Sequence, residues 1–116
     1  MVLTDIKKLI GFDEDYKAFD TDITIQINSA LSTLYQIGVD VTGYLTADGS
    51  EDWGDILGKN VDIEMIKNYI YLKTKLIFDP PLNGSILDAI KEQIKEYEWR
   101  INFEVEVPSD SIWEET

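Results

Sequence analysis

The 116-residue chain contains neither cysteine nor histidine. Without cysteine, it can form no disulfide, no thiolate metal site and no cysteine-based catalytic centre. Without histidine, it lacks the side chain that most often serves as a general base or a metal ligand, so a Ser–His–Asp triad is impossible. These two absences exclude the commonest catalytic and metal-binding arrangements.

Long apolar runs and positive charge are also scarce. No apolar segment reaches the roughly 20 residues that a membrane-spanning helix needs, and the first five residues do not form the basic, apolar start of a secretory signal, so we expect no membrane association. The chain has 10 basic and 23 acidic residues, a net charge of −13. Because such a surface repels phosphate, we expect no sequence-specific binding to nucleic acid.

The acidic excess is unevenly distributed along the chain. Residues 48–64 contain six acidic residues against one lysine, and residues 104–116 contain five acidic residues and no base. Residues 65–100 are nearly balanced, with six bases against five acids. We therefore expect the negative charge to gather on a middle loop and a C-terminal tail.

Length and hydrophobic spacing predict one small all-α domain. One domain is usual for about 100–150 residues, and we place it at residues 1–107, followed by an acidic tail at 108–116. Apolar residues recur at helical spacing in about four segments, which we expect to form a bundle with a long C-terminal helix. These segments are residues 3–10, 20–37, 60–79 and 85–105. Asp20 or Thr21, Asn60 and Ser85 are the expected caps of the last three.

The segment from Tyr69 to Pro81 indicates the central helix of that bundle. Two adjacent apolar rows run through residues 63–77 and predict a wide buried face. One row is Ile63, Ile66, Ile70 and Ile77, and the other is Met65, Tyr69, Leu72 and Leu76. Pro80 forbids continuation of the helix, and the short link after it predicts an antiparallel final helix.

Residues 39–59 read as an irregular acidic loop. Thr42-Gly43 and Asp48-Gly49 are turn signals. One helical turn is expected near Trp53, with Ser50 as its cap and the indole as the anchor of the loop.

Two carboxylate clusters are candidates for a chemical site. Glu51, Asp52 and Asp55 lie near Trp53, and residues 13–15 are all acidic. Neither cluster has the paired arrangement of a glycosidase or the ligand spacing of a calcium loop, so a solvated acidic surface is the simpler interpretation. No phosphate-binding glycine loop is present. We predict no catalytic residue, no metal site and no cofactor.

Aromatic residues outside the apolar rows are candidates for an interface. The last predicted helix has a single apolar row, formed by Ile86, Ile90, Ile94, Tyr97, Ile101 and Val105. Trp99 and Phe103 lie four residues apart on that helix, off the row, with Arg100 beside them. They either pack within the subunit or meet another one, because aromatic residues and arginine are favoured at subunit contacts. The candidate interface residues are Trp53, Trp99, Arg100, Phe103 and Trp113. Ile25 and Tyr35 also lie off their helical stripe.

The segments Tyr69–Pro81 (YIYLKTKLIFDPP) and Tyr97–Asn102 (YEWRIN) resemble segments of small head–tail connector proteins of tailed phages and prophages of Gram-positive bacteria. These proteins are also called adaptor or head-completion proteins. The resemblance implies an all-helical subunit that forms a ring below the portal, in the virion neck, after assembly in the host cytoplasm. It implies portal and tail-completion proteins as partners. Such proteins are not enzymes, so the resemblance assigns no catalytic residue to this chain.

The charge leaves a second function open. An acidic protein can mimic DNA and inhibit a nucleic-acid-binding protein, but a mimic needs carboxylates in a regular array, which the sequence does not reveal. Competition with DNA for a nuclease or repressor favours the mimic, and a ring or a portal complex favours the connector.

Overall fold

The computed structural model describes residues 1–106, with side chains to Asn102. This part of the chain contains five α-helices and no β-strand, which confirms the all-α prediction. The helices are α1 (Val2–Leu9), α2 (Asp20–Gln36), α3 (Trp53–Ile56), α4 (Ile63–Phe78) and α5 (Gly84–Glu106). α3 is the single turn expected near Trp53. None of the described helices is long and apolar enough to cross a lipid bilayer.

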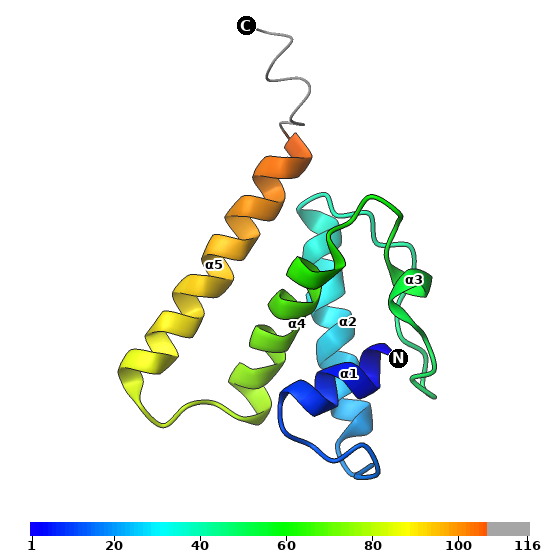
Figure 1. Ribbon diagram of the computed structural model, residues 1–116, viewed down its shortest axis with the longest axis vertical. Coiled ribbons are helices and arrows are strands. Elements are labelled where there is room, and N and C mark those ends of the chain that lie inside the picture. Colours follow the sequence, from blue (N-terminus) through cyan, green and yellow to red (C-terminus); the bar gives the residue numbers. More distant parts are fainter. Residues whose placement is uncertain (107–116) are drawn as a thin grey trace, which may run out of the picture.

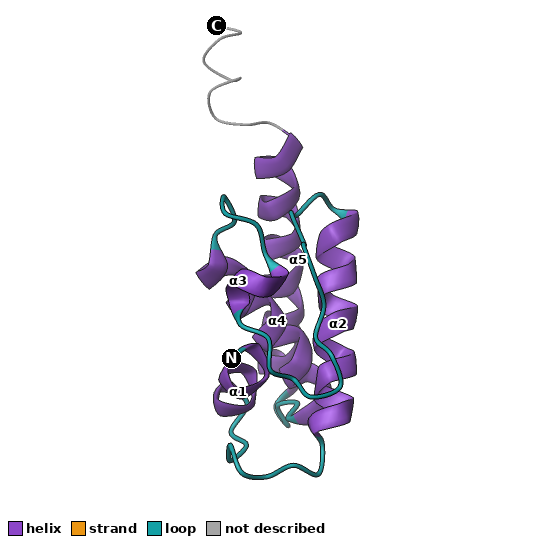
Figure 2. Ribbon diagram, turned by 90° about the vertical axis from the view of Figure 1, so that its right-hand side faces the viewer, coloured by secondary structure: helices purple, strands orange, loops and turns teal. Residues whose placement is uncertain are grey.

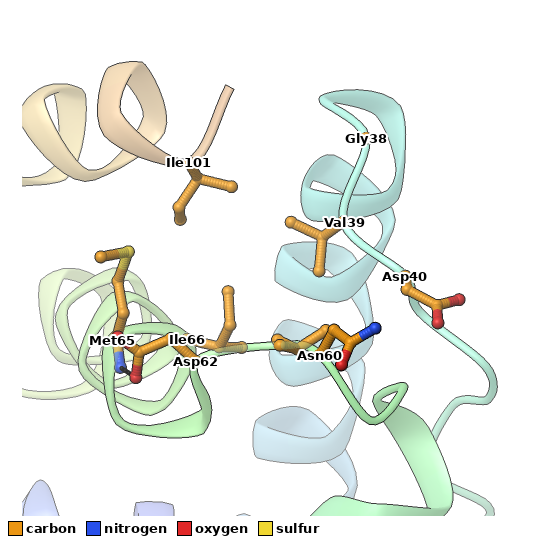
Figure 3. A pocket seen from close by; sticks show the side chains of 9 residues that line it. Gly38, Val39, Asp40, Asn60, Asp62, Met65, Ile66 and Ile101 are labelled. Carbon is orange, nitrogen blue, oxygen red and sulfur yellow. Dashed lines mark hydrogen bonds between the residues drawn. The ribbon is translucent and has the colours of Figure 1, made fainter. Parts of the chain in front are cut away.

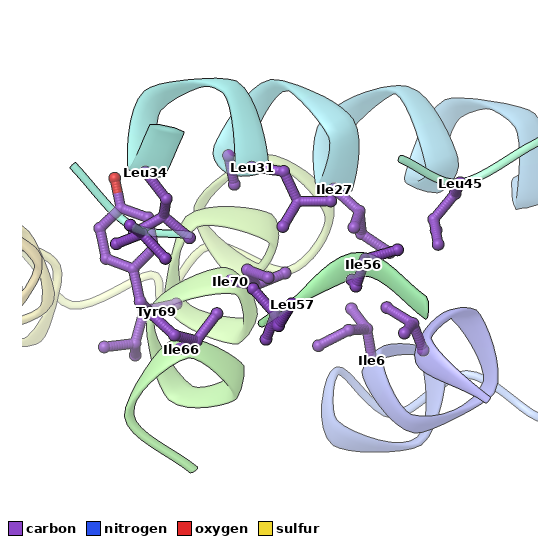
Figure 4. Close-up of a cluster of buried hydrophobic side chains, with 14 of the residues drawn as sticks. Ile6, Ile27, Leu31, Leu34, Leu45, Ile56, Leu57, Ile66, Tyr69 and Ile70 are labelled. Carbon is purple, nitrogen blue, oxygen red and sulfur yellow. The ribbon is translucent and has the colours of Figure 1, made fainter. Parts of the chain in front are cut away.

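Helix α4 lies at the centre of the bundle. α1, α2 and α5 all pack against it, and α5 returns antiparallel to it after the short link at residues 79–83 (Figure 1). Tyr69 and Ile70 are completely buried, and Ile66 is nearly so. Burying one such side chain stabilises the fold by roughly 1.5–3 kcal/mol. Figure 4 shows them meeting Leu34 and other apolar side chains of α2 together with Ile6 of α1.

Not every member of the predicted rows is buried. Ile77, in the last turn of α4, is 57% exposed, and Ile63 in its first turn is 38% exposed. Ile86, at the start of α5, is also exposed, whereas Ile90, Ile94 and Ile101 are buried. Helical spacing places residues on one face, but it does not show where the neighbouring helices end.

The middle segment, residues 37–62, is irregular but well packed. Its backbone doubles back through an isolated antiparallel bridge between Val41 and Leu57. The Asn28 side chain accepts from the Leu45 N–H at 2.8 Å and donates to its carbonyl at 3.0 Å, which ties the segment to α2. The buried Leu45 and Ile56 complete the core (Figure 4). Aliphatic side chains thus anchor the segment, in addition to Trp53.

The helix caps differ from the predicted ones by one or two residues. Asp62, not Asn60, caps α4, and its carboxylate accepts from the Met65 N–H at 3.2 Å. Asn83, not Ser85, caps α5 and accepts from the N–H groups of residues 85 and 86. Asp52 precedes α3 in place of Ser50, and Phe19 precedes α2 in place of Asp20 or Thr21. Several residues near each helix start have suitable side chains, so local sequence does not select among them.

A buried lysine holds the connection between α1 and α2. Lys7 is only 2% exposed, and its Nζ lies 2.8 Å from Asp20 Oδ1 at the start of α2. The same ammonium donates to the carbonyls of Glu14 and Tyr16 at 3.0 and 2.7 Å. Two hydrogen bonds to carbonyls and the ion pair with Asp20 thus offset the cost of burying the charge. This role was not predicted from the sequence.

The two isoleucines of one α4 row provide a matched test of the core. Ile70→Ala should lower the free energy of unfolding by about 3 kcal/mol, because it leaves a cavity at a fully buried position. Ile77→Ala should lower it by less than about 1 kcal/mol, because Ile77 is largely exposed already. Urea unfolding followed by circular dichroism measures both. Equal losses of unfolding free energy in the two variants would contradict the burial of α4 at the centre of the bundle.

The two neighbouring lysines of α1 test the buried ion pair. Lys7→Met should lower the free energy of unfolding by about 2–3 kcal/mol, because it leaves Asp20 and two carbonyls without their cation. Lys8→Met, which removes only an exposed pair with Glu14 at 3.7 Å, should change it by no more than about 0.5 kcal/mol. Thermal and urea unfolding give the comparison. An unchanged free energy of unfolding in Lys7→Met would show that the contacts of Lys7 with Asp20 and the two carbonyls do not stabilise the fold.

Candidate interaction surfaces

The outer side of α5 contains the most exposed tryptophan described. Trp99 is 66% exposed and lies two residues from the buried Ile101, which is about 200° round the helix. Arg100 beside it is exposed and pairs with Glu96, one turn earlier, at 2.5 Å. Phe103 follows one turn later on the α5 backbone, and its side chain lies outside the described part.

The other two candidate interface residues are placed differently. Trp53 is half-buried in α3, packs against the core, and donates from its indole N–H to Asp5 Oδ2 at 2.8 Å. The structure therefore shows it joining the middle segment to α1. Trp113 and the predicted acidic tail, residues 108–116, lie outside the described residues. An interface role for any of the five residues stays a prediction.

A hydrogen bond between α4 and α5 fixes which side of α5 faces outward. The Tyr69 hydroxyl donates to Glu98 Oε2 at 2.6 Å. Burial, reinforced by this bond to a carboxylate, raises the pKa of Tyr69 well above its ordinary value. Since Glu98 points toward α4, the adjacent Trp99 is turned toward solvent.

Apolar side chains are also exposed where α4 joins α5. Leu82 is fully exposed, and Ile77 and Ile86 are each more than half exposed. Helical periodicity did not identify Leu82, because it lies in the link between the helices. The Pro80-Pro81-Leu82 sequence, which is apolar and outside any helix, was the available signal.

A cavity of about 320 Å³ lies at the opposite end of the bundle (Figures 1 and 3). Figure 3 shows Val39, Met65, Ile66 and Ile101 pointing toward it from the middle segment just after α2, from the start of α4 and from α5. Asp40, Asn60 and Asp62 also line it. The lining is therefore partly apolar and partly polar, and it offers no nucleophile with a neighbouring base. Its walls come from separate segments, so sequence spacing did not reveal it.

The acidic middle segment has a compact hydrogen-bonded turn. The Thr46 hydroxyl lies 2.5 Å from Asp48 Oδ1 and 2.6 Å from Glu51 Oε2, and lowers the pKa of both carboxyls. A hydroxyl has one proton and donates to one carboxylate at a time. Backbone N–H groups of Ser50 and Thr46 donate to Asp48 and Glu51 respectively. Among the described residues, no group of three or more acidic side chains could hold a metal ion.

Replacing Tyr69 by phenylalanine tests the contact that orients α5. We expect the free energy of unfolding at pH 7 to fall by about 2 kcal/mol, because a bond to a charged acceptor is lost. The folded-state pKa of Tyr69 is raised, so the bond stabilises fully below the unfolded pKa of about 10, and the benefit is lost as the pH rises above it. The difference between wild type and Tyr69→Phe should therefore shrink above pH 10.

Urea unfolding between pH 7 and 11 measures this dependence. Tyr35→Phe, on an exposed side of α2, is the matched control and should leave stability unchanged within about 0.5 kcal/mol. A Tyr69→Phe difference that stays constant to pH 11 would show that the hydroxyl does not contribute through this bond.

Comparison with known proteins gives one family. The model of the family described as "Phage connector protein" matches residues 2–108, which is most of the chain. Neither the curated proteins nor the solved structures provided a match.

Proposed function

Because this chain belongs to the phage connector protein family, we propose that it joins the portal of the DNA-filled head to the tail. In this proposal it acts in the virion neck as a ring of identical subunits, and its partners are the portal and the tail-completion proteins. The family is a structural one, and membership indicates a virion component that contacts other head or tail proteins. The match over residues 2–108 is the observation that carries the proposal.

The distribution of apolar surface supports a protein with partners at both ends. The exposed Ile77, Leu82 and Ile86 lie at or beside the α4–α5 link. The cavity near Ile101, with Val39, Met65 and Ile66 also in its lining, lies at the other end of the bundle. Exposed apolar groups of this kind are usual where proteins meet. Two separate surfaces suit a subunit placed between a portal and a tail.

Acidic charge supports the passage of DNA through such a ring. A channel that DNA must cross should not bind its phosphates, and carboxylates repel them. We propose that the acidic middle segment, including Asp48, Glu51 and Asp55, faces the channel. The alternative function, a DNA mimic, rests on the net charge of −13 alone. We propose no catalytic activity.

Loss of the protein from the phage that encodes it tests the function. Disrupting its gene should yield DNA-filled heads and separate tails, because the joint between them is missing. Electron microscopy of the lysate shows the particles, and expression of the wild-type chain from a plasmid should restore tailed virions. Normal tailed particles from the disrupted phage would contradict the proposal.

A further inference from the structure

Beyond its first turn, which contains Asp20 and Asp22, α2 is free of charge. Residues 23–39 contain no acidic or basic residue, although the whole chain has 33 charged residues, 10 basic and 23 acidic. We define the uncharged α2 face as its exposed members, Ile25, Ser29, Ser32, Tyr35 and Gln36. Ile25 and Tyr35 are each 62% exposed. A solvated helix normally has charged residues on its outer side, so this face is suited to a protein contact.

No described element of the subunit covers this face. Figure 2 shows α2 at one edge of the molecule, with α4 and the middle segment on its other sides. The middle segment is held through Asn28, one turn before Ser32, so it runs along one border of this face. Ile25 and Tyr35 nevertheless stay 62% exposed. The uncharged α2 face is therefore available to another chain.

We propose that the uncharged α2 face binds the Trp99 side of α5 in a second copy of this chain. This inference rests on the proposed ring and names the two surfaces that form it. Each copy has a net charge of −13, so association is opposed by repulsion unless the surfaces that meet contain little charge. A second copy meets no like charge on residues 23–39.

The outer side of α5 satisfies the same electrostatic condition. Residues 91–100 have three bases and three acids. Lys95 pairs with Glu92, Arg100 pairs with Glu96, and Glu98 is bonded to Tyr69. By contrast, residues 48–64 have six acids and one base, so contact through the middle segments of two copies is unfavourable.

The shapes of the two faces are also complementary. Ile25, Ser29, Ser32 and Gln36 follow one another at steps of three and four residues, so they form one ridge along α2. The small side chains of Ser29 and Ser32 leave space between Ile25 and Tyr35. A large exposed side chain such as Trp99 fits such a space, and tryptophan and tyrosine are typical of residues that dominate contacts.

The positions of the two faces explain why a ring results. α2 and α5 pack on different sides of α4, so the two faces of one subunit cannot both be used in a single pair (Figures 1 and 2). Contact between two different surfaces is heterologous, and repeated contacts of this kind close into a ring when the rotation permits.

Cysteine cross-linking tests the assignment, because the chain has no native cysteine. A chain with Ser32→Cys and Lys95→Cys has one thiol on each face, and Lys95 lies one turn from Trp99. Virions that contain it, treated with a short bismaleimide, should yield a ladder of covalent multimers on a denaturing gel. The matched control, Ser32→Cys with Asp15→Cys, puts its second thiol on the exposed α1–α2 connection and should yield no ladder.

The outcomes separate this inference from the proposed function. Tailed virions with no ladder, or dimers from Ser32→Cys alone, would overturn the α2–α5 contact while leaving the connector role intact. Ser32→Glu places a like charge on the face and should reduce tailed particles at least tenfold without lowering the free energy of unfolding, because residue 32 is exposed. Normal numbers of tailed particles would also overturn the contact.

Discussion

The burial of α4 on several sides is the constraint on which the rest of the fold depends. α1, α2 and α5 each use it as their packing partner, and Tyr69 and Ile70 have no exposed surface. Each such side chain contributes roughly 1.5–3 kcal/mol, whereas an exposed ion pair such as Lys95–Glu92 contributes about 0–1 kcal/mol. Apolar burial around one helix therefore dominates the stability of this strongly acidic chain.

The same arrangement leaves the surfaces that the proposed function requires. α5 packs chiefly along α4, and the bond between Tyr69 and Glu98 joins the two helices. Trp99, next to Glu98, is 66% exposed. α2 packs inward with Ile27 and Leu34 and leaves Ile25 and Tyr35 outside. Neighbouring copies of the subunit could cover these exposed side chains.

Much of this organisation was predictable because it follows from local patterns. Helical spacing identified α4 and the row Ile90–Ile94–Ile101, and the double proline identified the end of α4. The position of Trp99 off the apolar row left open whether it packs within the subunit, and the structure shows it 66% exposed. Cap identities were wrong, since Asp62 and Asn83 compete with nearby residues of equal capping ability. The predicted burial of Ile77 and Ile86 was wrong, because the spacing of apolar residues within one helix does not show where the neighbouring helices end.

The sequence by itself determined the all-α class, the central helix, the antiparallel return of α5 and the exclusion of cysteine and histidine chemistry, because these depend on residue types and on spacing within one segment. Only the tertiary structure decided that Lys7 is buried against Asp20, that Asn28 holds Leu45, and that Val39, Met65 and Ile101 line one cavity. Those contacts join residues far apart in the chain, and their geometry depends on how the helices pack together.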